Sequence, residues 1–241
     1  MVQEVLGLAK ETGADITEEL CSKIVNLIPT STKKDNLLFQ ENGLTVHKDT
    51  PVFDGQLSNR CYTEAVKNAF LDFKAKAIKT GYFNPEEADL ITNQWSRIAV
   101  HLPYAFQGKR MFPDIFMLDR KNSKEGADIV SEIGIAPSYD ATSMHSVELE
   151  KAQNNYRRLV SKTKQYKGFV AAKIEKTQQA SALLGNQYTG SIFLALMSAL
   201  ELDLLDGTNI IGHKIGFCAY GSGAKSKVFE GVIQLGWKKI T

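Results

Sequence analysis

The apolar and polar positions of this chain predict several helices and a small buried sheet. Between Ser58 and Lys79 the apolar side chains recur at helical spacing on one stripe, which is typical of a core-facing helix. The apolar, partly β-branched run SRIAVHL at 96–102 predicts a buried strand that ends at Pro103. Residues 214–235 predict two strands joined by a Gly-Ser-Gly turn, as in a terminal hairpin.

The remaining periodic segments predict further helices. One covers residues 105–122 with a kink or restart at Pro113, and residues 147–180 predict two helices separated near Gly168. Residues 183–205 begin with a glycine-containing turn and continue into an almost wholly apolar helix, which we expect to be buried on most sides. Together these elements predict an α/β fold.

The first 50 residues form a peripheral segment of different character. Residues 1–30 predict two short helices, and residues 30–50 are polar and turn-rich, with LTVHK at 44–48 as a possible edge strand. A further helical turn is expected from Pro85. We therefore divide the chain into a helical and linker segment, 1–50, and a domain, 51–241.

Composition and charge narrow the class of protein. The chain has 241 residues, of which 43% are hydrophobic and 23% charged, as in a globular domain, and its formal charge of +2 gives no reason to expect nucleic acid as a partner. Three scattered cysteines predict neither a disulfide scaffold nor a zinc site. We find no secretory signal and no stretch of about 18 apolar residues. The expectation is a cytoplasmic protein, neither exported nor embedded in a membrane.

His101 is the histidine with the most suggestive position, because it closes the predicted buried strand. Catalytic groups of α/β folds often lie at strand ends, although a hydrogen-bonded core histidine is the commoner explanation of this pattern. The other three histidines occupy polar or loop contexts without the spacing of metal ligands, so no metal site is predicted.

Two glycine-containing turns are candidates for binding an oxygen. In GNQYTGS, 185–191, free amides and the positive helix end could receive a carbonyl or an anion, or Thr189 or Ser191 could simply cap the helix. The turn at 221–223 either only joins two strands or lets a backbone amide approach a thioester oxygen. It lacks the Gly-Lys-Ser/Thr ending of a phosphate-binding loop, which excludes that chemistry.

No cysteine has the context of a nucleophile, so we interpret Cys21, Cys61 and Cys218 as structural. Glu132 and Asp140 are possible acids, but surface carboxylates have the same pattern. The remaining candidates are the histidine at 101, the amide side chain of Asn186 and the Gly-Ser-Gly turn at 221–223, and none of them is a nucleophile.

Taken in order, four segments resemble hydroxymethylglutaryl-CoA synthase, a member of the thiolase-like superfamily. They are PVFDGQLSNRCY (51–62), HLPYAFQGKRM (101–111), GNQYTGS (185–191) and IGFCAYGSGA (215–224). All four resemble motifs of the second of the family's two similar halves. The resemblance implies the C-terminal portion of a layered αβαβα fold, with a mixed sheet covered by helices.

The resemblance also implies roles for individual residues. His101 would bind and polarise the acetoacetyl carbonyl, Asn186 would hydrogen-bond the acetoacetyl group, and the amide of Ser222 would stabilise the thioester oxyanion. Tyr188 would line the same pocket. Arg110, with Lys109 as its neighbour, falls where the family has a lysine that contacts CoA, and a cation there suits a phosphate. No cofactor is implied, since acetyl-CoA and acetoacetyl-CoA are substrates. Where some members have another lysine, this chain departs from the pattern with a phenylalanine at 106.

In the family, the first half carries the cysteine that becomes acetylated and the glutamate that acts as general acid/base. We expect this chain to be a fragment, a truncated reading frame or one subunit of a split enzyme, inactive alone and completed by a first half or a partner, with a homodimer as the complete form. The leading hypothesis is the acyl-CoA-recognising half of a synthase in the mevalonate route to isoprenoids. Two alternatives are a polyketide β-branching paralogue that uses carrier-protein substrates and a non-catalytic subunit of a split complex.

Overall fold

The structure is a computed structural model that describes residues 38–41, 44–47, 55–83, 90–137, 147–221 and 225–239. The chain divides into two compact units, one of residues 1–63 and 222–224 and one of residues 64–221 and 225–241. In the first unit, β1 (Leu38–Glu41) pairs antiparallel with β2 (Leu44–His47), which confirms the predicted edge strand. The helices expected within 1–30 and the turn at Pro85 fall outside the described residues.

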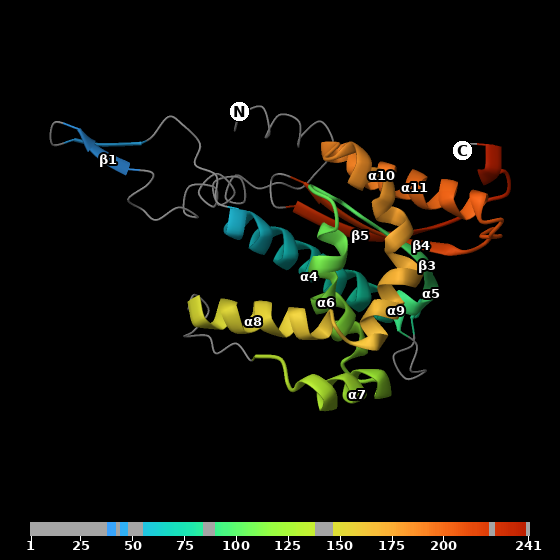
Figure 1. Cartoon of the computed structure of the whole chain (residues 1–241), viewed down its shortest axis with the longest axis horizontal. Coiled ribbons are helices and arrows are strands. Elements are labelled where there is room, and N and C mark those ends of the chain that lie inside the picture. Colours follow the sequence, from blue (N-terminus) through green and yellow to red (C-terminus); the bar gives the residue numbers. More distant parts are fainter. Residues whose placement is uncertain are drawn as a thin grey trace. The chain divides into compact units, whose positions relative to one another are not determined.

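The second unit contains a three-stranded mixed sheet in the order β3-β4-β5 (Figure 1). β3 (Trp95–Val100) runs parallel to β4 (Lys214–Gly221), and β4 runs antiparallel to β5 (Lys225–Val232). All three strands were predicted, and the last two form the expected hairpin. A parallel pair cannot be joined by a tight turn, and the long connection from β3 to β4 contains most of the helices.

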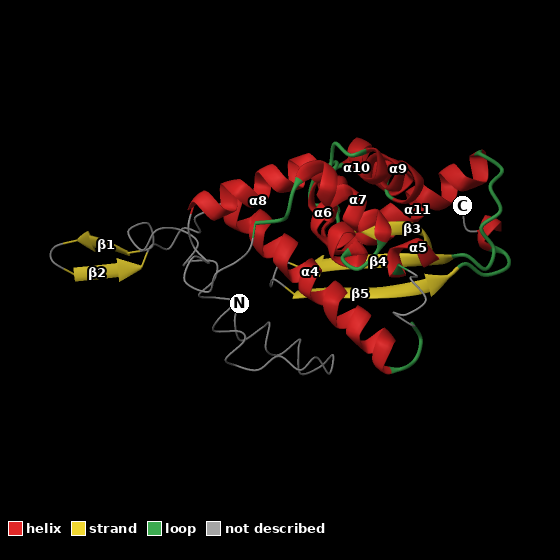
Figure 2. Ribbon diagram, turned by 90° about the horizontal axis from the view of Figure 1, so that it is seen from below, coloured by secondary structure: helices red, strands yellow, loops and turns green. Residues whose placement is uncertain are grey.

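Helices cover both faces of the sheet (Figure 2). The predicted long helix is α4 (Gly55–Lys79), whose Phe70 and Phe73 rings lie 6.3 and 5.9 Å from the ring of Trp95 on β3. Trp95 is fully buried, and it packs so closely on β4 that a Cβ atom at Gly216 would lie 2.2 Å from its ring. That glycine therefore allows the two strands and the tryptophan to pack together.

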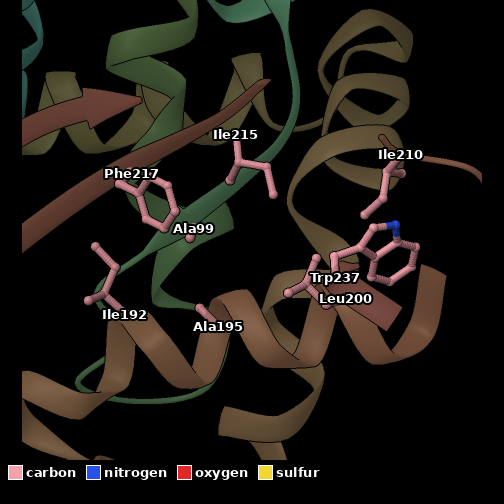
Figure 3. Close-up of a cluster of buried hydrophobic side chains, with 8 residues drawn as sticks. All are labelled: Ala99, Ile192, Ala195, Leu200, Ile210, Ile215, Phe217 and Trp237. Atoms are coloured by element: carbon pink, nitrogen blue, oxygen red, sulfur yellow. The ribbon is translucent and has the colours of Figure 1, made fainter. Parts of the chain in front are cut away.

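The opposite face of the sheet packs on α11 (Ser191–Leu205), the apolar helix predicted after the GNQYTG turn. Ala99 of β3 and Phe217 of β4 form one buried cluster with residues of this helix (Figure 3). The cluster comprises Ala99, Ile192, Ala195, Leu200, Ile210, Ile215, Phe217 and Trp237. The predicted fold class, a mixed sheet with helices packed around it, is confirmed.

Further helices lie between β3 and α11. The first of them are α5 (Ile91–Gln94), α6 (Gln107–Arg120), α7 (Lys124–Ile133) and α8 (Val147–Val160). The others are α9 (Lys164–Lys173), α10 (Glu175–Leu184) and the 3-10 turns η2 (Tyr188–Gly190) and η3 (Trp237–Lys239). Pro113 lies inside α6, where a kink or restart was expected.

The predicted break near Gly168 is wrong, because this glycine lies inside α9. The chain instead breaks between α8 and α9, where the Thr163 hydroxyl accepts a hydrogen bond from the Tyr166 amide and caps the new helix. A third helix, α10, then begins at Glu175. The capping hydroxyl therefore determines this boundary, and the helix tolerates the exposed glycine.

The apolar helix α11 is less buried in this chain than predicted. Phe193 is 64% exposed and Leu205 is 73% exposed, so one side of the helix faces away from the sheet. The segment Tyr188–Leu205 has 18 residues and a mean hydropathy of 1.4, which by length and composition would suffice to cross a membrane, contrary to our expectation that no segment would. Core helices of globular proteins also have this composition, and α11 packs on the sheet through its other side.

Candidate functional site

His101 follows directly after the last residue of β3 and remains attached to the sheet. Its backbone amide donates a hydrogen bond to the Cys218 carbonyl at 3.0 Å, and its side chain is only 9% exposed. The imidazole ring lies 6.2 Å from the ring of Tyr220, which is two residues after Cys218 on β4. Burial lowers the pKa of His101 from 6.5, so the imidazole is neutral at pH 7. A neutral imidazole can donate through one nitrogen and accept through the other.

Two cations lie in the first turn of the helix that follows His101. Lys109 and Arg110 are both exposed near the start of α6, and this turn contains no acidic residue. Cations are unfavourable at a helix N-terminus, where the helix dipole already places positive charge. An electropositive surface therefore lies within ten residues of the buried histidine, which suits an anionic ligand.

The peptide unit of Lys109 is held by two buried side chains from other helices. Gln178 of α10 accepts a hydrogen bond from the Lys109 amide at 3.3 Å, and the Tyr166 hydroxyl of α9 donates to the Lys109 carbonyl at 2.7 Å. Both side chains are 2% exposed, and burial raises the pKa of Tyr166 well above 10, so its hydroxyl stays protonated. Neither residue could be identified from the sequence, because each lies on an ordinary helix more than 50 positions away.

Asn186 lies in the turn between α10 and α11 and organises that turn. Its side-chain carbonyl accepts hydrogen bonds from the Tyr188 amide at 2.8 Å and from the Ser191 hydroxyl at 3.2 Å. The Ser191 hydroxyl in turn accepts from the Gln187 amide at 3.0 Å. Within the described residues the side-chain NH₂ group of Asn186 has no partner, so it can donate to a ligand.

The ordinary cap considered for this helix is not observed. Gly190 is the residue before α11 and makes no side-chain cap, while Ser191 is the first helical residue and directs its hydroxyl to the turn. Thr189 belongs to the 3-10 turn and is exposed. The polar groups of the turn therefore hold its shape and do not cap the helix with a side chain.

Two aromatic residues of the candidate site have left-handed backbone conformations. Phe106 has φ 68° and Tyr188 has φ 48°, and they are the two non-glycine residues with positive φ in the described part of the chain. Phe106 directly precedes α6, which carries Lys109 and Arg110, and Tyr188 begins the 3-10 turn that follows Asn186. Such a conformation costs about 1–3 kcal/mol and is concentrated at functional sites. The strain is therefore an indication of function that does not depend on sequence similarity.

The histidine segment and the asparagine turn adjoin elements of one buried cluster. Ala99, near the end of β3, lies in one buried cluster with Ile192 and Ala195 in the first turns of α11 (Figure 3). His101 follows Ala99 by two residues, and Asn186 precedes Ile192 by six. The segments that carry His101 and Asn186 thus each adjoin, in sequence, an element that contributes to this cluster.

The other candidates contribute little to this site. Ser222 lies outside the described residues, as does Asp140, and Glu132 is exposed on α7. Cys218 is fully buried in β4, and burial raises the pKa of its thiol to about 12, so it is not a nucleophile at neutral pH. In the described part of the chain no group of three His, Cys, Asp or Glu side chains could hold a metal ion.

A known family model matches most of this chain. The sequence model described as "Hydroxymethylglutaryl-coenzyme A synthase C terminal" matches residues 44–239. This chain belongs to the hydroxymethylglutaryl-CoA synthase family. The matched region is the C-terminal part of these enzymes and includes His101, Lys109, Arg110, Asn186 and Tyr188.

Curated relatives are hydroxymethylglutaryl-CoA synthases, which are acyltransferases. The enzyme of Haloferax volcanii is 26% identical over 226 residues, which cover 93% of this chain and 48% of that protein. The cytoplasmic enzyme of Rattus norvegicus is 25% identical over 195 residues, 75% of this chain and 33% of that protein. This chain therefore spans half or less of the length of these relatives.

A solved structure, "MvaS in complex with 3-hydroxy-3-methylglutaryl coenzyme A", has the same fold. It matches with a TM-score of 0.56 and 20% sequence identity, covering 86% of this chain and 42% of that chain. The similarity shows that the described sheet and helices share the fold of that structure.

Proposed function

We propose that this chain is the half of a hydroxymethylglutaryl-CoA synthase that recognises acetoacetyl-CoA. In the complete reaction, the acetyl group on a cysteine of the first half condenses with acetoacetyl-CoA, and hydrolysis releases hydroxymethylglutaryl-CoA for the mevalonate route in the cytoplasm. The observation that carries the proposal is the family match over residues 44–239, which includes the buried, neutral His101 and the Asn186 turn.

The described geometry suits the proposed division of roles. A neutral His101 can donate a hydrogen bond to the acetoacetyl carbonyl that becomes the alcohol, and the free NH₂ of Asn186 can donate to the same group. Tyr188, 77% exposed beside Asn186, would line the acyl site. The exposed Lys109 and Arg110 would bind the phosphates of CoA. The Ser222 amide would stabilise the thioester oxyanion.

The exposed side of α11 supports a partner for this chain. Leu183, Leu184 and Tyr188 before the helix and Phe193 and Leu205 within it are all more than 60% exposed. Exposed apolar patches of this kind mark interaction surfaces. The first half of the synthase, in the same polypeptide or a separate one, would cover this patch and supply the cysteine and the glutamate. Two completed subunits would form the homodimer.

Calorimetric titration of acetoacetyl-CoA into the purified chain tests the proposal. We expect binding, and about fivefold weaker binding for His101→Ala and for Asn186→Ala, because each removes a hydrogen bond worth about 1 kcal/mol. The chain alone should not condense acetyl-CoA with acetoacetyl-CoA.

The variant His213→Ala is a matched control, because His213 is an exposed histidine outside both loops. It should bind as the wild type does. Failure of the wild-type chain to bind acetoacetyl-CoA would contradict the proposal, as would condensation activity of the chain alone. Binding of acetoacetyl groups on a carrier protein in place of the CoA thioester would favour the polyketide enzymes.

A further inference from the structure

Phe106 adopts a strained conformation that the core of the protein does not explain. Its φ of 68° places the phenylalanine backbone in the region that favours glycine, yet its side chain is 45% exposed. A ring that filled the core would repay the strain by burying apolar surface. This ring remains partly in water, and its residue makes no side-chain cap to α6. Neither burial in the core nor a side-chain cap accounts for the strain, and the exposed ring has a contact on the protein surface.

The contact is with the ammonium group of Lys109, which lies 4.1 Å from the centre of the Phe106 ring. This is a cation–π distance. The backbone of the same lysine is held from both sides, since Gln178 accepts from its amide and Tyr166 donates to its carbonyl. Lys109 is thus fixed at its amide, its carbonyl and its ammonium group, although its side chain is exposed.

A lysine side chain normally loses conformational entropy when it binds an anion, because its rotatable bonds become fixed, and that loss weakens binding. A lysine that is already fixed in the free protein avoids most of this loss. The Phe106 ring therefore restrains the ammonium group of Lys109, as Gln178 and Tyr166 restrain its peptide unit. The rest of the ammonium group remains open to solvent and to a ligand.

We propose that Phe106 is a positioning residue that holds the Lys109 ammonium group ready for a phosphate group of the thioester ligand. This proposal rests on the proposed function, in which Lys109 binds the phosphates of CoA. It predicts that the left-handed phenylalanine contributes to the affinity for a phosphate-bearing ligand and not to the stability of the fold.

Two probes separate this role from a general one: coenzyme A, which carries phosphates, and pantetheine, which carries the same thiol arm without them. We expect Phe106→Leu to weaken coenzyme A binding about two- to fivefold, the value of an exposed cation–π contact, and to leave pantetheine binding unchanged. Phe106→Tyr retains a ring and should bind coenzyme A as the wild type does. In a Lys109→Gln background, Phe106→Leu should cause no further loss, because the group it positions is gone.

Unfolding measurements provide the second readout. Phe106→Gly should weaken coenzyme A binding as Phe106→Leu does, while its unfolding midpoint stays equal to or above that of the wild type, because glycine adopts this conformation without strain. Tyr82→Leu is the matched control: its ring lies under the Lys214 ammonium group at 4.5 Å, elsewhere in the same unit and without positive φ. It should leave coenzyme A binding unchanged.

The outcomes distinguish this inference from the proposed function. If the wild-type chain binds no coenzyme A, both are overturned. Suppose the wild-type chain binds coenzyme A. Only the positioning role is then overturned if Phe106→Leu binds coenzyme A equally well, or if this variant loses affinity for coenzyme A and pantetheine alike. A marked fall in the unfolding midpoint of Phe106→Gly would likewise assign the ring to the stability of the fold.

Discussion

At the scale of single residues, environment decides the chemistry of this chain. His101 follows the end of β3, and His213 precedes the start of the parallel strand β4. His101 is 9% exposed and neutral at pH 7, whereas His213 is exposed to water. Cys218 shows the same effect, since a fully buried thiol with a pKa of about 12 stays protonated at neutral pH and packs as a small apolar side chain. Sequence identified these residues but could not assign their protonation states.

Burial of His101 predicts a pH dependence of stability. Its pKa in the folded chain lies below the value of 6.5 for an exposed histidine, so the unfolded chain takes up a proton first as the pH falls. The stability that depends on neutral His101 is therefore complete above pH 6.5 and is lost as the pH falls below it. In His101→Gln, which cannot be protonated, urea unfolding midpoints should fall less than in the wild type between pH 7.5 and 5.5. Equal falls in both proteins would contradict this prediction.

At the scale of elements, periodicity predicted most helices and strands, and local hydrogen bonding decided the rest. The stripe of apolar residues predicted α4, and the run SRIAVHL predicted β3 to within one residue at its start. Gly168 was wrongly interpreted as a helix end, because a threonine cap five residues earlier determined where α9 begins. Glycine in a helix reduces stability but does not by itself end the helix.

Two glycine substitutions test this explanation. Gly168→Ala should stabilise the chain by about 0.5–1 kcal/mol, because alanine loses less backbone entropy in a helix and its methyl group would meet no atom within 4 Å. Gly126→Ala in α7 is the matched comparison and should destabilise, because its Cβ would lie 2.1 Å from the Arg120 carbonyl oxygen. Urea unfolding of both variants measures the difference. Destabilisation by Gly168→Ala would indicate that α9 does not continue through this position.

At the scale of the whole molecule, the second unit exposes apolar side chains along one side of α11. A helix that is apolar on all sides is stable only when most of it is buried. Here the sheet covers one side, and the other exposes Phe193, Met197 and Leu205. This side of α11 therefore presents apolar surface to solvent, and the chain spans 48% of the length of the Haloferax volcanii relative.

This surface predicts association of the purified chain. The double variant Phe193→Glu/Leu205→Glu should reduce concentration-dependent light scattering, because carboxylates on the patch oppose apolar association. It should also prevent assembly with the first half of a synthase. Leu235→Glu is a matched control, since Leu235 is 84% exposed outside the patch. Equal scattering of the wild type and the double variant would exclude α11 as the associating surface.

The sequence by itself determined the element types, the mixed α/β class and the family motifs, because apolar periodicity and short motifs are local properties of the chain. It also identified His101, Lys109 and Asn186 as candidates. The tertiary structure decided the left-handed Phe106, the Gln178 and Tyr166 hydrogen bonds to Lys109, and the exposed side of α11. The Gln178 and Tyr166 bonds join residues far apart in the sequence, and the exposure of α11 depends on what the rest of the fold covers. The left-handed backbone of Phe106 is local, but neither it nor the long-range contacts leave a periodic pattern from which they could be predicted.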